Sequence, residues 1–302
     1  MAPLEGVRIL DLTRLLPGAY CTLLLADLGA DVVKIEDTGR GDYLRWMPPQ
    51  DDRGSVMFRA LNRNKQSVAL DLKQDAGRAA FLDLVEHADV VLEGFRPGVL
   101  ERLGLGYPVL RERNRGVILC RITGYGQSGP LRDRAGHDIN YMALAGALGV
   151  SRTGGATPTA PGLQSGDLGG GALHAAVGIL TALIQRDRSG EGTEIDIAML
   201  DGLVAWMAPL LAAQRASGAR IDERGTLLTG RYPCYRVYPC ADGFMSLGAL
   251  EPKFWAEFLE SIGCEPLLPL QFAEGDDGDA AADAIEKVLR TRTREQWSEH
   301  FG

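Results

Sequence analysis

Two short segments of this chain place proton-transferring side chains beside glycine-rich turns. Gly136-His137-Asp138-Ile139-Asn140-Tyr141 carries an imidazole, and Gly166-Asp167-Leu168-Gly169-Gly170-Gly171 carries a carboxylate, each in a loop ahead of an apolar helical run. General acid–base catalysis needs groups whose protonation changes near neutral pH, and histidine or a perturbed aspartate meets that need. The types of His137 and Asp167 suit proton abstraction next to a carbonyl. The pair alone does not establish catalysis, because histidines and aspartates are scattered through the chain.

Composition limits the classes of partner. The 302 residues can form one large domain or two ordinary ones, and their formal net charge is −8. An acidic chain argues against nucleic acid or an anionic membrane as the main partner, because phosphate neutralisation needs clustered Lys and Arg. The longest apolar run, residues 203–213, contains Pro209 and is shorter than the ~20 residues of a membrane span. With no export leader at the N-terminus, we expect a cytoplasmic protein.

The cysteines give no sign of a metal site. They are odd in number, irregularly spaced and without histidine partners at metal-ligand distances, so we expect reduced thiols and no bound metal. The five positions are Cys21, Cys120, Cys234, Cys240 and Cys264.

Hydrophobic patterning predicts an α/β fold. A buried strand at 7–12, a helix at 17–28 and a second strand at 31–36 form a βαβ unit, which implies a parallel sheet. The alternation continues with strands at 67–72, 89–93, 117–122 and 193–198 and helices at 75–87, 170–185 and 201–217. We predict an open Rossmann-like parallel sheet in a large domain, residues 1–218.

The C-terminal part has a different pattern. Residues 219–230 are a polar, glycine-containing connector, which we interpret as a linker. A hairpin within 235–247 and amphipathic helices at 253–262 and 279–290, with another helix starting at Thr293, predict a smaller α+β domain at 231–302. The acidic tract 274–279 is expected to be an exposed loop.

A nicotinamide cofactor fits poorly. Glu36 ends the second strand where a dinucleotide enzyme would hold a ribose, but the first turn, residues 13–18, lacks G-x-G-x-x-G. Without those glycines the backbone cannot approach a pyrophosphate, so we expect no NAD.

Several motifs occur together in order along nearly the whole chain. They are LEGVRILDL at 4–12, DLGADVVKIE at 27–36, NRNKQS at 62–67, EGFRPG at 93–98, TGYGQSGP at 123–130 and the two segments above. Jointly they resemble the CaiB/BaiF (class III) coenzyme A-transferase family, especially its α-methylacyl-CoA racemase branch.

This resemblance implies an acyl-CoA thioester as substrate. In racemases the aspartate matching Asp167 is one of two proton carriers, and His137 stands where the racemases also carry histidine. The implied reaction is racemisation of a 2-methylacyl-CoA by 1,1-proton transfer between His137 and Asp167, with their pKa values drawn together by burial of Asp167. The alternative is a class III CoA-transferase, in which Asp167 forms an aspartyl-CoA thioester. A third possibility is an inactive or binding-only member.

Two features depart from the racemase pattern. Leu163 stands four residues before Asp167, where racemases usually have asparagine, and family members usually continue beyond Gly302.

The resemblance also suggests further site residues. Arg40, Lys65 and Arg96 are candidates for the coenzyme A phosphates, and they follow strand-like segments, where ligands of open α/β sheets collect. Gly169 and Gly170, with Gly171, either offer N–H groups to an enolate oxygen or allow close helix packing. No cofactor beyond the CoA moiety is expected.

Glu251 and the oligomeric state complete these expectations. Glu251 either orients His137 or is a surface carboxylate at a helix start. Family resemblance also implies an intertwined homodimer.

Overall fold

The computed structural model describes residues 1–151, 157–218 and 226–302. They form two compact units, Met1–Gly146 with Pro161–Met207, and Ala147–Ala160 with Ala208–Gly302. The large unit therefore ends before the predicted boundary at 218, because helix α10 (Ala208–Ser217), which buries none of its residues, groups with the second unit. Most of the predicted linker, residues 219–225, lies outside the described residues.

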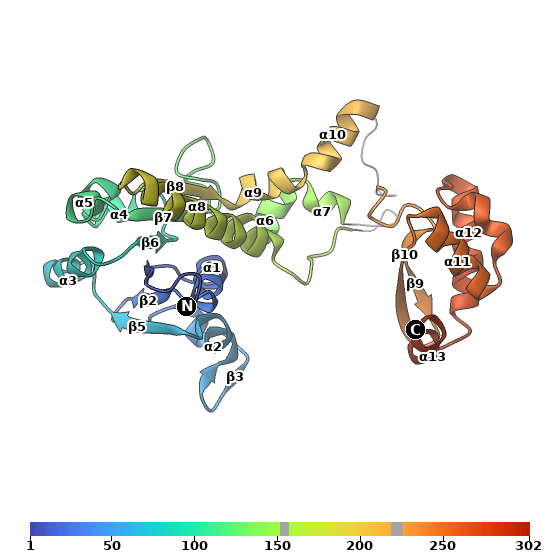
Figure 1. The fold of residues 1–302 in the computed structure, drawn as a ribbon, viewed down its shortest axis with the longest axis horizontal. Helices are drawn as coiled ribbons and strands as arrows, with labels where there is room; N and C mark the ends of the chain where they lie inside the picture. The colour runs from blue at the N-terminus through green and yellow to red at the C-terminus, as the bar shows by residue number, and fades with distance from the viewer. Residues whose placement is uncertain (152–156, 219–225) are drawn as a thin grey trace. The chain divides into compact units, whose positions relative to one another are not determined.

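A six-stranded parallel sheet forms the centre of the large unit and confirms the predicted fold class (Figure 1). Its order is β5-β2-β1-β6-β7-β8. Every residue of β6 and β7 is buried, as expected when both faces of a parallel sheet are covered. The strands are β1 (Arg8–Asp11), β2 (Asp31–Glu36), β5 (Lys65–Ala69), β6 (Val90–Glu93), β7 (Ile118–Thr123) and β8 (Glu194–Ala198).

Helices cover this sheet, and a hydrophobic core that includes Phe81, Leu100 and Leu119 fills the space between. The helices of the large unit are α1 (Leu16–Asp27), α2 (Val56–Asn62), α3 (Asp75–Val85), α4 (Val99–Arg102), α5 (Tyr107–Arg113), α6 (Asp138–Leu144), the π-helix η2 (Gly166–Leu173), α8 (His174–Ser189) and α9 (Met199–Trp206). A short 3₁₀ turn, η1 (Tyr43–Trp46), and the small hairpin of β3 (Gln50–Asp51) and β4 (Gly54–Ser55) follow β2, and α7 (Ala147–Val150) groups with the second unit.

Two helices differ from their predicted bounds. The helix expected at 170–185 runs from Gly166 to Ser189 as η2 and α8; it is long and apolar enough to cross a membrane by length and composition, but half of its most apolar stretch is buried inside the protein. The single helix expected at 201–217 is divided at Met207 into α9 and α10. Pro209 explains the division, because proline lacks an N–H and is tolerated only in a first helical turn.

The second unit contains the predicted hairpin, formed by β9 (Tyr235–Cys240) and β10 (Gly243–Gly248). The helices α11 (Pro252–Ile262), α12 (Gly275–Leu289) and α13 (Arg294–Phe301) and the 3₁₀ turn η3 (Glu265–Leu270) follow, around a core centred on Trp255 and Trp297. The acidic tract at 274–279 is not a loop: it caps and begins α12. Negative charge is favourable at a helix N-terminus, and Asp276 and Asp277 occupy the first turn.

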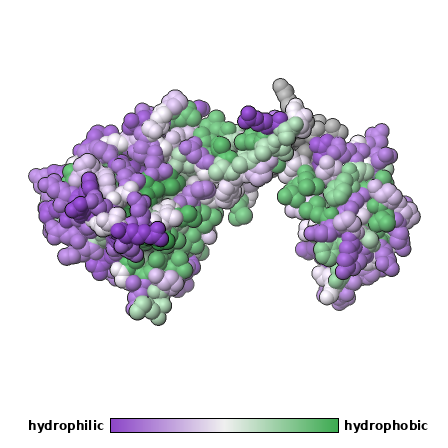
Figure 2. All heavy atoms as spheres, turned by 45° about the horizontal axis from the view of Figure 1, so that its top comes forward, coloured by the Kyte–Doolittle hydropathy of each residue, from purple (hydrophilic) through white to green (hydrophobic). Residues whose placement is uncertain are grey.

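The surface of both units retains apolar side chains (Figure 2). Val177 on α8 is 61% exposed, and Phe244 on β10 is 71% exposed.

Glycines allow η2 and α9 to pack backbone against backbone. A Cβ added to Gly170 would lie 2.4 Å from the carbonyl oxygen of Met199, and one added to Gly202 would lie 2.3 Å from the carbonyl oxygen of Gly170. At Gly169 an added Cβ would lie 2.0 Å from the Trp206 ring. Close helix packing therefore accounts for Gly169 and Gly170.

We predict that Gly170→Ala lowers the free energy of unfolding by about 1–3 kcal/mol, because the added methyl group overpacks this contact. Chemical denaturation measures the change. Gly149→Ala in α7 is the matched control, since its Cβ would meet nothing within 4 Å; alanine there should be neutral or stabilising. An unchanged unfolding midpoint for Gly170→Ala would contradict the packing role.

Candidate active site

His137 lies at the N-terminal end of α6. Its backbone N–H donates to Asn140 Oδ1 at 3.0 Å, and the Asn140 N–H donates to the His137 carbonyl oxygen at 2.8 Å. These two bonds fix the backbone at the start of the helix. The His137 side chain is exposed, so a substrate can reach its ring.

Asp138 connects the two segments that carry His137 and Asp167. Its Oδ1 accepts hydrogen bonds from the N–H groups of Gly166, at 2.6 Å, and Asp167, at 3.0 Å. The first N–H groups of a helix have no partner within it, so this carboxylate caps η2 and is favoured by its dipole. Asp167 therefore lies in the first turn of the π-helix and not in a loop. Asp138 was not among the site residues predicted from the sequence, where its one signal is its place between His137 and a helix start.

A cavity of about 750 Å³ within the large unit brings His137 and Asp167 together. Asn140 and Tyr141 line it as well. The residues that follow β1, β6 and β7 form other parts of the wall, among them Thr13, Gly94 and Gly124. These are the carboxyl ends of the strands, the edge at which open α/β sheets bind ligands.

The charge state of Asp167 is perturbed in this cavity. Burial, reinforced by the negative charge of Asp138, raises the pKa of Asp167 to about 6, although the nearby His137 opposes the rise. The largest cause of this rise is burial of the carboxyl group, the same cause that was expected from the sequence. At this pKa the Asp167 carboxyl can both accept and release a proton near neutral pH.

Four arginines line the same cavity: Arg14, Arg96, Arg132 and Arg134. The guanidinium of Arg14 donates to Tyr43 Oη at 3.0 Å and to Asp37 Oδ2 at 3.2 Å, which restricts its direction. Of these four, only Arg96 was singled out from the sequence. The others lie in irregular segments, where sequence alone does not show that they converge.

The structure does not place Arg40 or Lys65 on the cavity wall. Lys65 Nζ donates to the Ala19 carbonyl, Thr22 Oγ1 and Asn62 Oδ1, and its side chain is 1% exposed. Burial lowers the pKa of Lys65 to about 8. With all three protons used inside the protein, its predicted role as a phosphate ligand conflicts with the structure.

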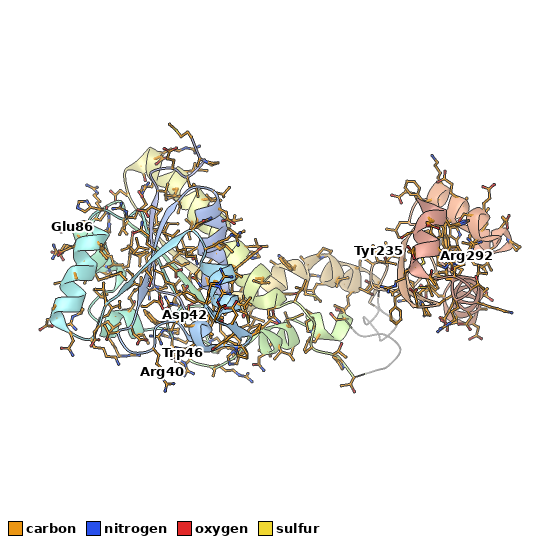
Figure 3. The ribbon with its side chains drawn as sticks, turned by 90° about the horizontal axis from the view of Figure 1, so that it is seen from below. Arg40, Asp42, Trp46, Glu86, Tyr235 and Arg292 are labelled. Carbon is orange, nitrogen blue, oxygen red and sulfur yellow. The ribbon has the colours of Figure 1, made fainter. Side chains whose placement is uncertain are left out.

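Arg40 and Glu251 remain predictions. Arg40 is exposed at the edge of the large unit (Figure 3). Glu251 is an exposed residue of the second unit, at the N-cap of α11, where its side chain makes no capping hydrogen bond. Gly169 and Gly170 are buried in η2 and do not line the cavity.

Comparison with known proteins identifies the family. The model for CoA-transferase family III matches residues 4–302. The chain belongs to CoA-transferase family III. A CaiB/BaiF family protein from Brucella suis has a similar crystal structure, with a TM-score of 0.84 and 30% identity over 99% of this chain and 81% of that one.

Relatives with both activities of this family are similar to the chain. It is 38% identical over 301 residues to the α-methylacyl-CoA racemase of Mus musculus, covering 99% of this chain and 74% of that protein. It is 39% identical over 250 residues to the succinyl-CoA:glutarate CoA-transferase of Mus musculus, covering 82% of this chain and 57% of that protein. Family membership supports an enzyme acting on acyl-CoA, and the identities do not separate the two reactions.

We predict that Asp138→Asn lowers the pKa of Asp167 below about 6. The amide keeps an oxygen at the position of Oδ1 but removes the negative charge that raises this pKa. Carboxyl ¹³C NMR titration, assigned with Asp167→Asn, measures the shift. Asp133→Asn is the control, because Asp133 lines the cavity but is not among the charges that perturb Asp167. An unchanged titration of Asp167 in Asp138→Asn would contradict the electrostatic coupling.

Proposed function

We propose that this protein is an acyl-CoA racemase or epimerase that inverts the α-carbon of a 2-methylacyl-CoA thioester. The observation that carries the proposal is that two proton carriers, His137 and Asp167, line one cavity and interact electrostatically. A transferase needs the carboxylate alone. Two groups that can each accept and release a proton are what proton removal and return require.

The reaction needs one mobile proton between the two groups. In one direction the Asp167 carboxylate removes the α-proton, the C–H electron pair becomes the enolate, and protonated His137 returns a proton to the opposite face of the carbon. The product enantiomer leaves with Asp167 protonated and His137 neutral, and the roles reverse for the other enantiomer. The N-terminal end of η2, which continues into α8, lies at this cavity, and its dipole favours the negative charge of the enolate.

Binding of the coenzyme A phosphates would fall to the arginines of the cavity. Arg14, Arg96, Arg132 and Arg134 supply positive charge, and guanidinium groups bind phosphate through paired hydrogen bonds. An otherwise acidic protein thus has a local site for one phosphorylated ligand. An intertwined homodimer is part of the proposal, since a second copy would cover exposed apolar side chains such as Val177 and Ile184 on α8.

The second candidate is a class III CoA-transferase. It is favoured by the similarity to a succinyl-CoA:glutarate CoA-transferase and by Leu163, where the racemase pattern has asparagine. In this reaction the Asp167 carboxylate attacks the thioester and expels CoA thiolate, which then attacks the resulting anhydride at the Asp167 carbonyl. The acyl group leaves as a carboxylate, and the aspartyl-CoA thioester transfers CoA to a second acid.

We predict that the protein exchanges the α-proton of a 2-methylacyl-CoA with solvent in deuterated water, without a second carboxylic acid. Proton NMR follows loss of the α-proton signal, and chromatography follows the distribution of CoA between acyl groups. His137→Asn and Asp167→Asn should each reduce exchange by at least about 100-fold, since general acid–base groups contribute that much. Transfer of CoA to an added acid with no deuterium at the α-carbon would support the transferase instead.

We also predict that Glu251→Gln reduces turnover by about tenfold or more and moves the histidine-dependent step of the pH profile to lower pH. A carboxylate bonded to His137 would favour its protonated form and fix its tautomer, as the acid does in nucleophile–base–acid triads. Glu257→Gln on the same helix is the matched control, because Glu257 is an exposed partner of Lys253. An unchanged pH profile, with at most ~1 kcal/mol lost in stability, would leave Glu251 as a helix-end carboxylate only.

A further inference from the structure

Leu15 has a backbone conformation that leucine rarely adopts. Its φ and ψ angles are 62° and −155°, a region that is populated almost only by glycine. Among the described residues with positive φ, all are glycine except Leu15 and Asn64, and asparagine tolerates such angles far better than leucine does. Leu15 stands at the N-cap of α1 and lines the cavity that holds His137 and Asp167.

A buried ion pair holds this turn on both sides of Arg14. The N–H of Leu15 donates to Asp42 Oδ1 at 3.1 Å, and Lys34 Nζ donates to the carbonyl oxygen of Thr13 at 2.8 Å. Lys34 Nζ lies 2.9 Å from Asp42 Oδ2, and the two side chains are 1% and 0% exposed. We call the Lys34 and Asp42 side chains, which bond to this turn, the Lys34–Asp42 clamp.

Further hydrogen bonds hold the clamp and the turn in place, so the strain at Leu15 is not relieved by a shift of the clamp. The backbone N–H of Asp42 donates to Glu36 Oε2 at 2.8 Å, and Asp11 Oδ1 accepts from the Thr13 N–H at 2.9 Å. Burial opposes the charge on Lys34, but Asp11 and Asp42 outweigh it and raise the pKa of Lys34. Figure 3 shows Asp42 inside the large unit, whereas its neighbour in sequence, Arg40, lies at the edge.

Stability alone does not explain this arrangement. A buried ion pair is a weak source of stability, because desolvation of both charges offsets their attraction. Glycine at position 15 would remove the strain, as it does at the other positive-φ turns. The chain instead keeps a leucine that lines the cavity, beside an arginine that lines it as well.

We propose that Lys34 and Asp42 are positioning residues, which hold Leu15 in its strained conformation so that Arg14 and the Leu15 side chain are preorganised to bind the coenzyme A ester. The inference rests on the proposed assignment of this cavity to coenzyme A. Because the clamp bonds to Thr13 and Leu15, it fixes the Cα of Arg14 between them. The Asp37 and Tyr43 contacts then fix the direction of its guanidinium.

The first test compares Leu15→Gly with Leu15→Ala by thermal unfolding. Both variants remove the side chain, but only alanine keeps the strain. If the clamp imposes this conformation, the glycine variant melts at the higher temperature, which reverses the usual order of the two residues. A higher melting temperature for Leu15→Ala overturns the proposal, and this result does not depend on whether the protein binds coenzyme A.

The second test measures the Kd of free coenzyme A by calorimetry in a cycle of full-length variants. Asp42→Asn should weaken binding about tenfold with leucine or alanine at position 15, because the turn must then be ordered by the ligand. With glycine at position 15 the same change should cost only about two- to threefold, since no strain has to be imposed. An equal loss in all three backgrounds overturns the proposal.

Asp51→Asn is the control for removal of a carboxylate. Asp51, in β3, forms an ion pair with Arg59, in α2, and makes no bond to the clamp. The affinity of Asp51→Asn for coenzyme A should therefore equal that of the wild-type protein. If wild-type protein does not bind coenzyme A, the proposed function fails, while the melting order of the two Leu15 variants still decides whether the clamp strains the turn.

Discussion

The carboxylate of Asp138 is the interaction on which the candidate site depends. By accepting the N–H groups of Gly166 and Asp167, it joins the start of α6 to the start of η2. His137 and Asp167 are thirty residues apart in sequence. The Asp138 bridge holds both residues at the wall of the same cavity. The same carboxylate helps to hold the pKa of Asp167 near 6. One side chain thus contributes both to the geometry of the pair and to the proton affinity of Asp167.

This bridge works because η2 is fixed from its other side. Gly170 and Gly202 let η2 and α9 approach without side chains between them, and a Cβ at either position would collide with backbone. The parallel sheet supplies the remaining walls, since turns after β1, β6 and β7 open at its carboxyl edge. The site is therefore built where rigid elements end, which suits chemistry that needs two groups at a fixed separation.

Cationic side chains serve two different purposes in the large unit. The side chains of Lys65 and Lys34 are each 1% exposed to solvent. Both donate hydrogen bonds to backbone or side-chain oxygens within the fold. Arg14, Arg96, Arg132 and Arg134 instead line the cavity, where we propose that they bind a phosphorylated ligand. Membership in a sequence motif does not separate these purposes, because a cation that follows a strand can point into the fold or into the cavity.

The parallel sheet, the C-terminal hairpin and the helix start at Thr293 could be predicted from the sequence, since they follow from local residue patterns. The sequence also identified His137 and Asp167 as groups able to exchange a proton. It could not show that Asp138 bridges them, that Lys65 is enclosed, or that 274–279 starts a helix. Those outcomes depend on contacts between residues far apart in the chain, or on competition between loop composition and a helix dipole. Which polar groups are buried depends on the packing of the folded chain, and burial shifts their pKa values and limits their partners.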